Sequence, residues 1–169
     1  MLKKLKFVVD KILESLLGTL IVVMVILALW QIFTRYILKN PASFTTEFLR
    51  YALLWLALLA AAYCFGKKAH LAIVFLKEKF SGKLLLIINI FTELTIIFFA
   101  LTVLVYGGTQ GVIMAKAEMS PTLFIPISYI YIVFPVSGVF IVFYSLINLI
   151  DLFTDKKINQ TEEVTQSTM

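Results

Sequence analysis

The chain is poor in the side chains that perform chemistry. It has one cysteine and one histidine in 169 residues, and only one charged residue, Glu93, lies within its four longest apolar stretches. A lone cysteine cannot form an internal disulfide, and one histidine cannot supply both axial ligands of a bis-histidine haem. The sequence contains no glycine-rich phosphate loop. We therefore expect no catalytic, cofactor-binding or metal-binding site, no ATP hydrolysis and no enzyme activity.

Apolar residues, in contrast, are abundant, at 61% of the chain against about 45–50% in soluble domains. A bilayer core about 30 Å thick needs about 20 apolar residues in a helix. The sequence predicts an all-α integral membrane protein, because its apolar stretches are apolar on all sides rather than on one face. Residues 1–154 form one predicted domain, and residues 155–169 a polar, disordered tail. The predicted spans are residues 15–34, 49–66, 84–106 and 127–150.

Amphipathic segments flank the predicted spans. Residues 3–13 and Ala69–Phe80 both combine apolar and basic side chains and predict short helices lying along the membrane surface. A simple basic flank to span one explains the first segment equally well. Ahead of span two, Ser43 or Thr45 is a possible helix N-cap.

Glycine and proline predict where the later spans begin, bend and end. Gly107, Gly108 and Gly111 are expected to loosen the chain after span three. Pro126 suits a helix start, and Pro135 is expected to kink span four because it offers no backbone N–H.

The net charge of +5 is distributed unevenly between the two sides of the predicted membrane. With the N-terminus in the cytoplasm, eleven basic residues lie on that side and four on the other. The four are Arg35, Lys39, Arg50 and Lys116. The positive-inside rule then predicts that both termini are cytoplasmic. This placement favours a membrane protein over a nucleic-acid-binding protein.

Glu93 is the one charge well inside a predicted span. It lies ten residues beyond Lys83, about 15 Å along a helix. A carboxylate at that depth is costly and marks a candidate functional site. Three interpretations remain open: pairing at a helix interface, a hydrogen-bonded group near Asn89 and Thr92, or transport chemistry.

Several other residues are candidates for anchoring or partner contact. Arg35 and Tyr36 end span one, while Glu47 and Arg50 precede span two and can pair on one helix face. Interfacial anchoring alone explains these four residues. Two further candidates are Trp55, placed for helix packing, and His70, placed at the inner surface.

Read together, these residues resemble the DctQ-type small membrane subunit of tripartite ATP-independent periplasmic (TRAP) transporters. The resemblance covers about Trp30 to Leu149. The family pattern has an acidic residue eight before a tryptophan and a histidine fifteen after it, spacings that Glu47, Trp55 and His70 keep. One departure is Ala60, where the family often has glycine. The remaining matches are Arg35-Tyr36, Asn40-Pro41, Arg50-Tyr51, Ser120, Leu123, Ile125-Pro126, Tyr129, Pro135 and Gly138.

The resemblance implies a scaffold subunit in a bacterial inner membrane, surrounded by lipid. Its expected partners are a large multi-span subunit that carries the transport sites and a periplasmic protein that delivers an organic acid, such as a C4-dicarboxylate or a sialic acid. Transport would be driven by sodium rather than ATP, with the large subunit moving like an elevator against the scaffold. Charge reversal at Glu47 or Arg50 would then disturb docking on the outer side.

Two other hypotheses are a self-sufficient homo-oligomeric transporter or channel that uses Glu93 as its coupling carboxylate, and a membrane electron carrier or enzyme subunit. The single histidine argues against the last.

Overall fold

The chain is helical along nearly all of the part that its structure describes. The computed structural model describes residues 2–40, 42–67 and 83–167. Within these residues the only extended pairing is an isolated bridge between Met119 and Pro126. The predicted all-α architecture with four membrane-spanning helices is confirmed. Among the described residues, four helical stretches are long and apolar enough to cross a membrane, namely Lys4–Tyr36, Ser43–Gly66, Ile87–Ala117 and Ile127–Leu152.

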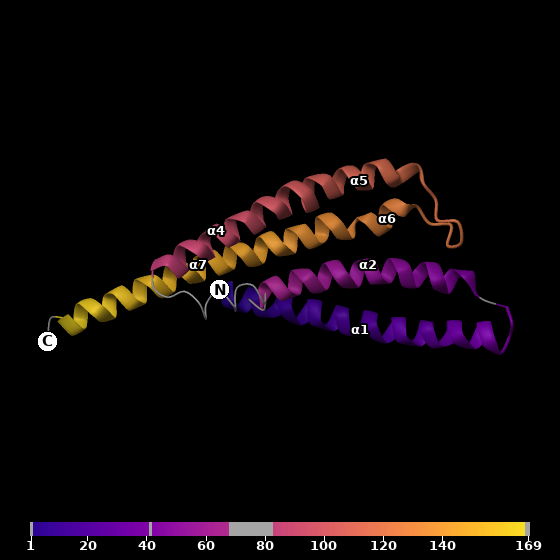
Figure 1. Ribbon diagram of the computed structural model, residues 1–169, viewed down its shortest axis with the longest axis horizontal. Coiled ribbons are helices and arrows are strands. Elements are labelled where there is room, and N and C mark those ends of the chain that lie inside the picture. Colours follow the sequence, from indigo (N-terminus) through magenta and orange to yellow (C-terminus); the bar gives the residue numbers. More distant parts are fainter. Residues whose placement is uncertain (1, 41, 68–82, 168–169) are drawn as a thin grey trace.

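The four spans lie side by side, with α2 and α7 in the middle (Figure 1). Helix α1 (Leu2–Tyr36) packs on α2 (Ser43–Gly66), which packs on α7 (Val133–Ser167). On its other side α7 contacts α4 (Lys83–Phe99) and the π-helical segment η1 (Ala100–Gly107). In the most apolar stretch of span four, 44% of the residues are buried, whereas in the corresponding stretch of span one 11% are buried. Most of the apolar surface of α1 is therefore not covered by the other helices of the chain.

The array has two distinct ends. The start of α1 and the end of α7 lie toward one end, which we call the terminal end (Figure 1). The other end carries the connection between α1 and α2 and the loop of residues 118–126, and we call it the loop end.

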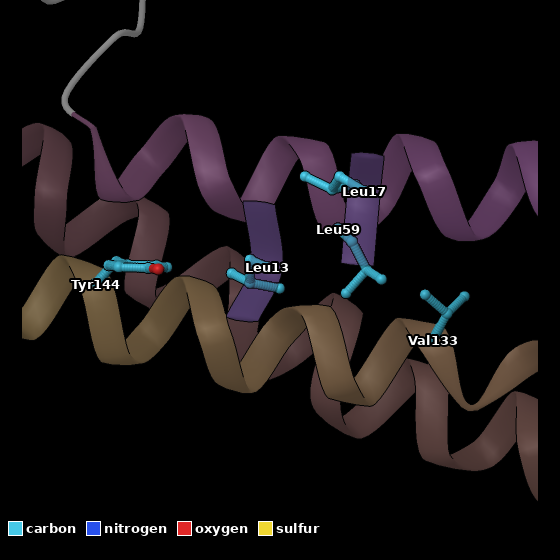
Figure 2. Packing of buried hydrophobic residues seen from close by; sticks show 5 residues of the cluster. All are labelled: Leu13, Leu17, Leu59, Val133 and Tyr144. Atoms are coloured by element: carbon cyan, nitrogen blue, oxygen red, sulfur yellow. The ribbon is translucent and has the colours of Figure 1, made fainter. Parts of the chain in front are cut away.

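The main apolar core joins α1 and α2 to α7. Leu13 and Leu17 come from α1, Leu59 from α2, and Val133 and Tyr144 from α7 (Figure 2). Each of these side chains is at most 9% exposed. Burying a large apolar side chain contributes about 1.5–3 kcal/mol in water, but within lipid the gain comes from tight packing instead.

A second core is built from small residues and closes the contact between η1 and α7. Ala62 and Ala100 are fully buried beside Leu104 and Ile141. Gly138 lies against η1, because a Cβ atom added there would come within 2.8 Å of the Leu104 Cβ. Small residues of this kind let helix backbones approach closely within a membrane.

The glycines after residue 106 do not end span three, contrary to the sequence prediction. Helix α5 (Gly108–Met114) and a 3₁₀ turn, η2 (Ala115–Ala117), continue the span. Gly108 is buried because Phe134 and Pro135 of span four lie directly over its Cα. This glycine therefore permits close packing rather than chain flexibility.

Helix α1 is continuous from Leu2, so residues 3–13 run directly into span one. Leu13 is buried in the core, which fits the interpretation of this segment as a flank of the span. The second predicted surface helix, Ala69–Phe80, lies outside the described residues.

The start of α2 differs from the sequence prediction. The helix begins at Ser43 after Ala42, and no side chain caps it. Instead, the Thr45 hydroxyl donates to the Ala42 carbonyl at 2.5 Å. The prediction of a Ser43 or Thr45 cap is wrong because the helix begins before either side chain can cap it.

Span four is interrupted close to Pro135. Pro126 precedes α6 (Ile127–Tyr131), and α7 begins after a break at Ile132. Pro135 has no N–H for the Tyr131 carbonyl, which accounts for the break. Helix α7 then continues to Ser167, through residues for which the sequence predicts disorder. No proline or glycine lies between residues 153 and 167 to stop it.

Candidate functional site

Glu47 ties two distant segments together at the loop end. Its side chain is 8% exposed, and one carboxylate oxygen accepts a hydrogen bond from the Tyr51 hydroxyl at 2.7 Å. The other oxygen accepts one from the Thr122 backbone N–H at 3.0 Å. Thr122 is 75 residues further along the chain, in the loop before span four. The carboxylate thus fixes that loop against α2.

The loop of residues 118–126 has a defined internal structure. The Ser120 N–H donates to the Ile125 carbonyl at 2.9 Å, and the Ile127 N–H donates to the Glu118 carbonyl at 3.0 Å. Phe124 has a φ of 54°, a conformation that costs a bulky residue about 1–3 kcal/mol. Its ring is nonetheless 77% exposed. The contacts of the loop, including that with Glu47, therefore sustain a strained turn that presents an aromatic side chain outward.

The other candidates at the loop end are exposed. Arg50 forms no ion pair with any residue that the structure describes, so the pairing with Glu47 expected from their spacing is not formed. Arg35 lies over the ring of Tyr36, with 5.9 Å between the guanidinium carbon and the ring centroid. These positions leave Arg35, Tyr36 and Arg50 available to lipid or to a partner.

A second polar contact joins three spans toward the terminal end. The Tyr144 hydroxyl of α7 donates to Asp10 of α1 at 2.6 Å, and the ammonium group of Lys67 lies 3.6 Å from the other oxygen of Asp10. The neighbouring Tyr63 side chain, and then the Asp10 carboxylate, raise the pKa of this lysine above its ordinary value. Gly66 makes room for the Tyr144 ring, since an added Cβ would lie 2.6 Å from it.

Removing the Tyr144 hydroxyl tests this contact. We expect Tyr144→Phe to lower the free energy of unfolding in detergent by about 1–3 kcal/mol, because a partly buried carboxylate loses its donor while the ring still packs on Gly66. Tyr129→Phe is the matched control, since that tyrosine is 62% exposed. Equal unfolding midpoints for the two variants would show that the contact with Asp10 contributes nothing.

Glu93 is directed at span four of its own chain. It is 5% exposed on α4, and the Asn148 side-chain amide donates to its carboxylate at 3.2 Å. The same amide group lies 3.3 Å from the Phe65 carbonyl, near the end of α2. Asn148 therefore connects α2, α4 and α7. Of the three interpretations that the sequence leaves open, one places the hydrogen-bonding neighbours of Glu93 at Asn89 and Thr92.

The remaining candidate residues take part in helix packing, start a helix, or lie outside the described residues. Trp55 packs against the main core. Pro126 starts span four, and Pro135 lies against Gly108. His70 falls outside the described residues, and so does Pro41.

Sequence reasoning missed Asp10, Tyr144 and Asn148. Asp10 lies in an amphipathic segment and Tyr144 in an apolar run, so the sequence marks neither as one partner of a polar contact between helices. A stronger signal was available for Asn148, since an amide within an otherwise apolar span usually has a buried partner.

The described polar groups connect helices at separate levels of the array. Among the residues that the structure describes, no group of three or more histidine, cysteine, aspartate or glutamate side chains is placed to hold a metal ion. What the observed arrangement does is hold neighbouring spans in fixed relation to one another.

Comparisons with known proteins agree with the residues quoted from the sequence. The family model for the DctQ component of tripartite ATP-independent periplasmic transporters matches residues 24–155. The chain is 27% identical over 151 residues to the sialic acid TRAP transporter small permease protein SiaQ of Vibrio cholerae serotype O1. That match covers 89% of this chain and 87% of the relative. A Haemophilus influenzae protein provisionally named a TRAP transporter small permease protein is 32% identical over 79 residues, or 47% of this chain and 49% of that protein.

Proposed function

This chain belongs to the DctQ family, the small membrane component of TRAP transporters, and we propose that it is the scaffold that anchors the large subunit of such a transporter. It is a multi-pass membrane protein and a transporter component. In this proposal the large subunit carries the substrate and moves against the small subunit. Transport is driven by a sodium gradient without ATP, and a periplasmic binding protein delivers the substrate.

The observation that carries the proposal is where the chain places its polar and its apolar side chains. The carboxylates of Asp10, Glu47 and Glu93 all contact other helices or loops of the same chain. Large apolar side chains remain exposed on the outer helices, for example Ile26 at 59% and Phe98 at 69%. A firmly cross-linked array with broad apolar faces is suited to supporting a partner within a membrane.

The substrate class follows from the relative whose name states one. The Vibrio cholerae protein is named for sialic acid, an acidic sugar. We propose an organic acid of the sialic acid or C4-dicarboxylate type for the transporter that contains this chain. The small subunit need not touch the substrate itself.

The orientation in the proposal rests on the distribution of basic residues. The loop end carries Arg35, Lys39, Arg50 and Lys116, and the sequence predicts that the other eleven lysines lie on the opposite side. The terminal end is therefore cytoplasmic and the loop end periplasmic, in a bacterial inner membrane.

Co-expression with the large subunit tests the proposal. We expect affinity purification through a tag on this chain to yield a 1:1 complex whose mass equals the sum of the two subunits. In liposomes, this chain alone should take up no labelled organic acid under a sodium gradient, whereas the complex with its binding protein should. Uptake by this chain alone, together with a homo-oligomer that ignores the large subunit, would instead establish a self-sufficient transporter and make Glu93 its first candidate residue.

A further inference from the structure

An apolar groove runs between α1 and α2 from the loop end toward the middle of the array. Its volume is about 620 Å³, within the range of about 300–1,000 Å³ typical of small-molecule sites. Apart from Thr46 and Arg50, both in the half of α2 nearer the loop end, its lining is apolar. The residues central to the argument are Met24, Val25, Ala28, Leu49, Arg50 and Leu53.

The length and position of the groove match one leaflet of a bilayer. On α2 it extends from Thr46 to Leu56, ten residues or about 15 Å of helix. Leu56 is close to the midpoint of α2, so the groove covers about half of a span. A bilayer core about 30 Å thick gives each leaflet about the same depth. A partner helix would be expected to contact a span along more of its length.

The charge at the mouth of the groove matches a phosphate group. Arg50 is exposed and makes no ion pair with any residue in the described part of the chain. Glu47, the nearest acid on α2, is already engaged by Tyr51 and Thr122. A long arginine side chain near a helix end extends to the membrane interface, where its guanidinium can bind a phosphate through two hydrogen bonds.

We propose that this groove binds one acyl chain of a phospholipid whose phosphate is held by Arg50. The acyl chain covers the apolar walls formed by α1 and α2, and the guanidinium fixes the head group at the loop end. The site requires only that the chain spans a membrane, so it stands independently of which solute the transporter carries.

Native mass spectrometry of the full chain tests the proposal, with palmitoyl-oleoyl-phosphatidylglycerol as the added lipid. We expect one phospholipid to be retained per chain. Arg50→Gln should weaken its binding about tenfold by removing the charge-assisted hydrogen bonds. Lys116→Gln is the control, because it removes one positive charge from an exposed residue outside the groove at the same end of the array.

Filling the groove distinguishes an enclosed acyl chain from a lipid attracted by charge alone. Ala28→Phe should abolish retention although Arg50 is still present, and Leu53→Trp, on the opposite wall, provides a second blocking variant if the first fails to fold. Retention unchanged by a folded blocking variant would overturn the proposal, and so would equal losses in Arg50→Gln and Lys116→Gln. It would also be overturned if, in the complex with the large subunit, a photo-crosslinker at Leu53 reacted with that subunit and not with lipid.

Discussion

Glu47→Ala is expected to release the loop of residues 118–126 from α2. The substitution leaves the Tyr51 hydroxyl and the Thr122 N–H without their acceptor, and a buried donor that loses its partner is costly. The strained backbone at Phe124 is then free to relax, which favours the released loop further. We expect protease cleavage within the loop to become about tenfold faster or more, because cleavage follows the population of the open form. The thermal midpoint should fall by about 5 °C.

Three further variants make this test specific. Tyr51→Phe removes one of the two donors and should give a smaller increase in loop cleavage. Glu47→Gln keeps an uncharged acceptor and should lie between the wild type and Glu47→Ala. Glu118→Gln changes an exposed acidic residue of the same loop and should have no effect. If Glu47→Ala and Glu118→Gln were cleaved at the same rate, Glu47 would not be what anchors the loop.

For Glu47, the sequence predicts the location in the molecule but not the long-range contact. Its spacing from Trp55 and His70 identifies the family, and its place before span two predicts the right end of the molecule. Its contact with Thr122 could not be predicted, because Thr122 lies 75 residues away and only the packing of the helices brings the two together. The nearby Arg50 is the obvious choice from sequence, but in the structure it faces the groove instead.

Glu93 gives the same lesson within the membrane. One charge in an apolar run is easily recognised as a buried polar group. One partner of Glu93 is Asn148, 55 residues away on another helix, and only the packing of α4 against α7 brings the two together. Helix positions follow from local apolar runs, whereas polar pairs depend on which helix faces which.

The glycines of span three were misjudged from sequence for a related reason. In water, adjacent glycines favour a flexible end to a helix, because glycine gains the most backbone freedom. Within a membrane every backbone polar group must find an internal partner, so the helix continues. The missing side chain then serves close packing, as it does at Gly108 beneath Pro135.

The adjacent residues Gly107 and Gly108 allow this explanation to be tested with a matched pair of variants. In Gly108→Ala the new methyl group would lie 2.7 Å from the Phe134 Cβ and 3.1 Å from the Pro135 backbone nitrogen, so span four must move away. We expect the free energy of unfolding in detergent to fall by about 1–3 kcal/mol, the usual cost of overpacking a close contact. In Gly107→Ala the nearest neighbouring atom is the Thr102 carbonyl oxygen at 3.6 Å, an ordinary contact. That variant should match the wild type or gain up to about 1 kcal/mol from the better helix propensity of alanine.

The difference between the two variants separates packing from flexibility. If these glycines served to loosen the chain, both alanine variants would stiffen it, and both would change stability in the same direction. If Gly108 is there to admit span four, only Gly108→Ala should destabilise the protein, and Gly108→Ser should do so as well because its Cβ occupies the same position. Equal stability of Gly107→Ala and Gly108→Ala would disprove the packing role of Gly108.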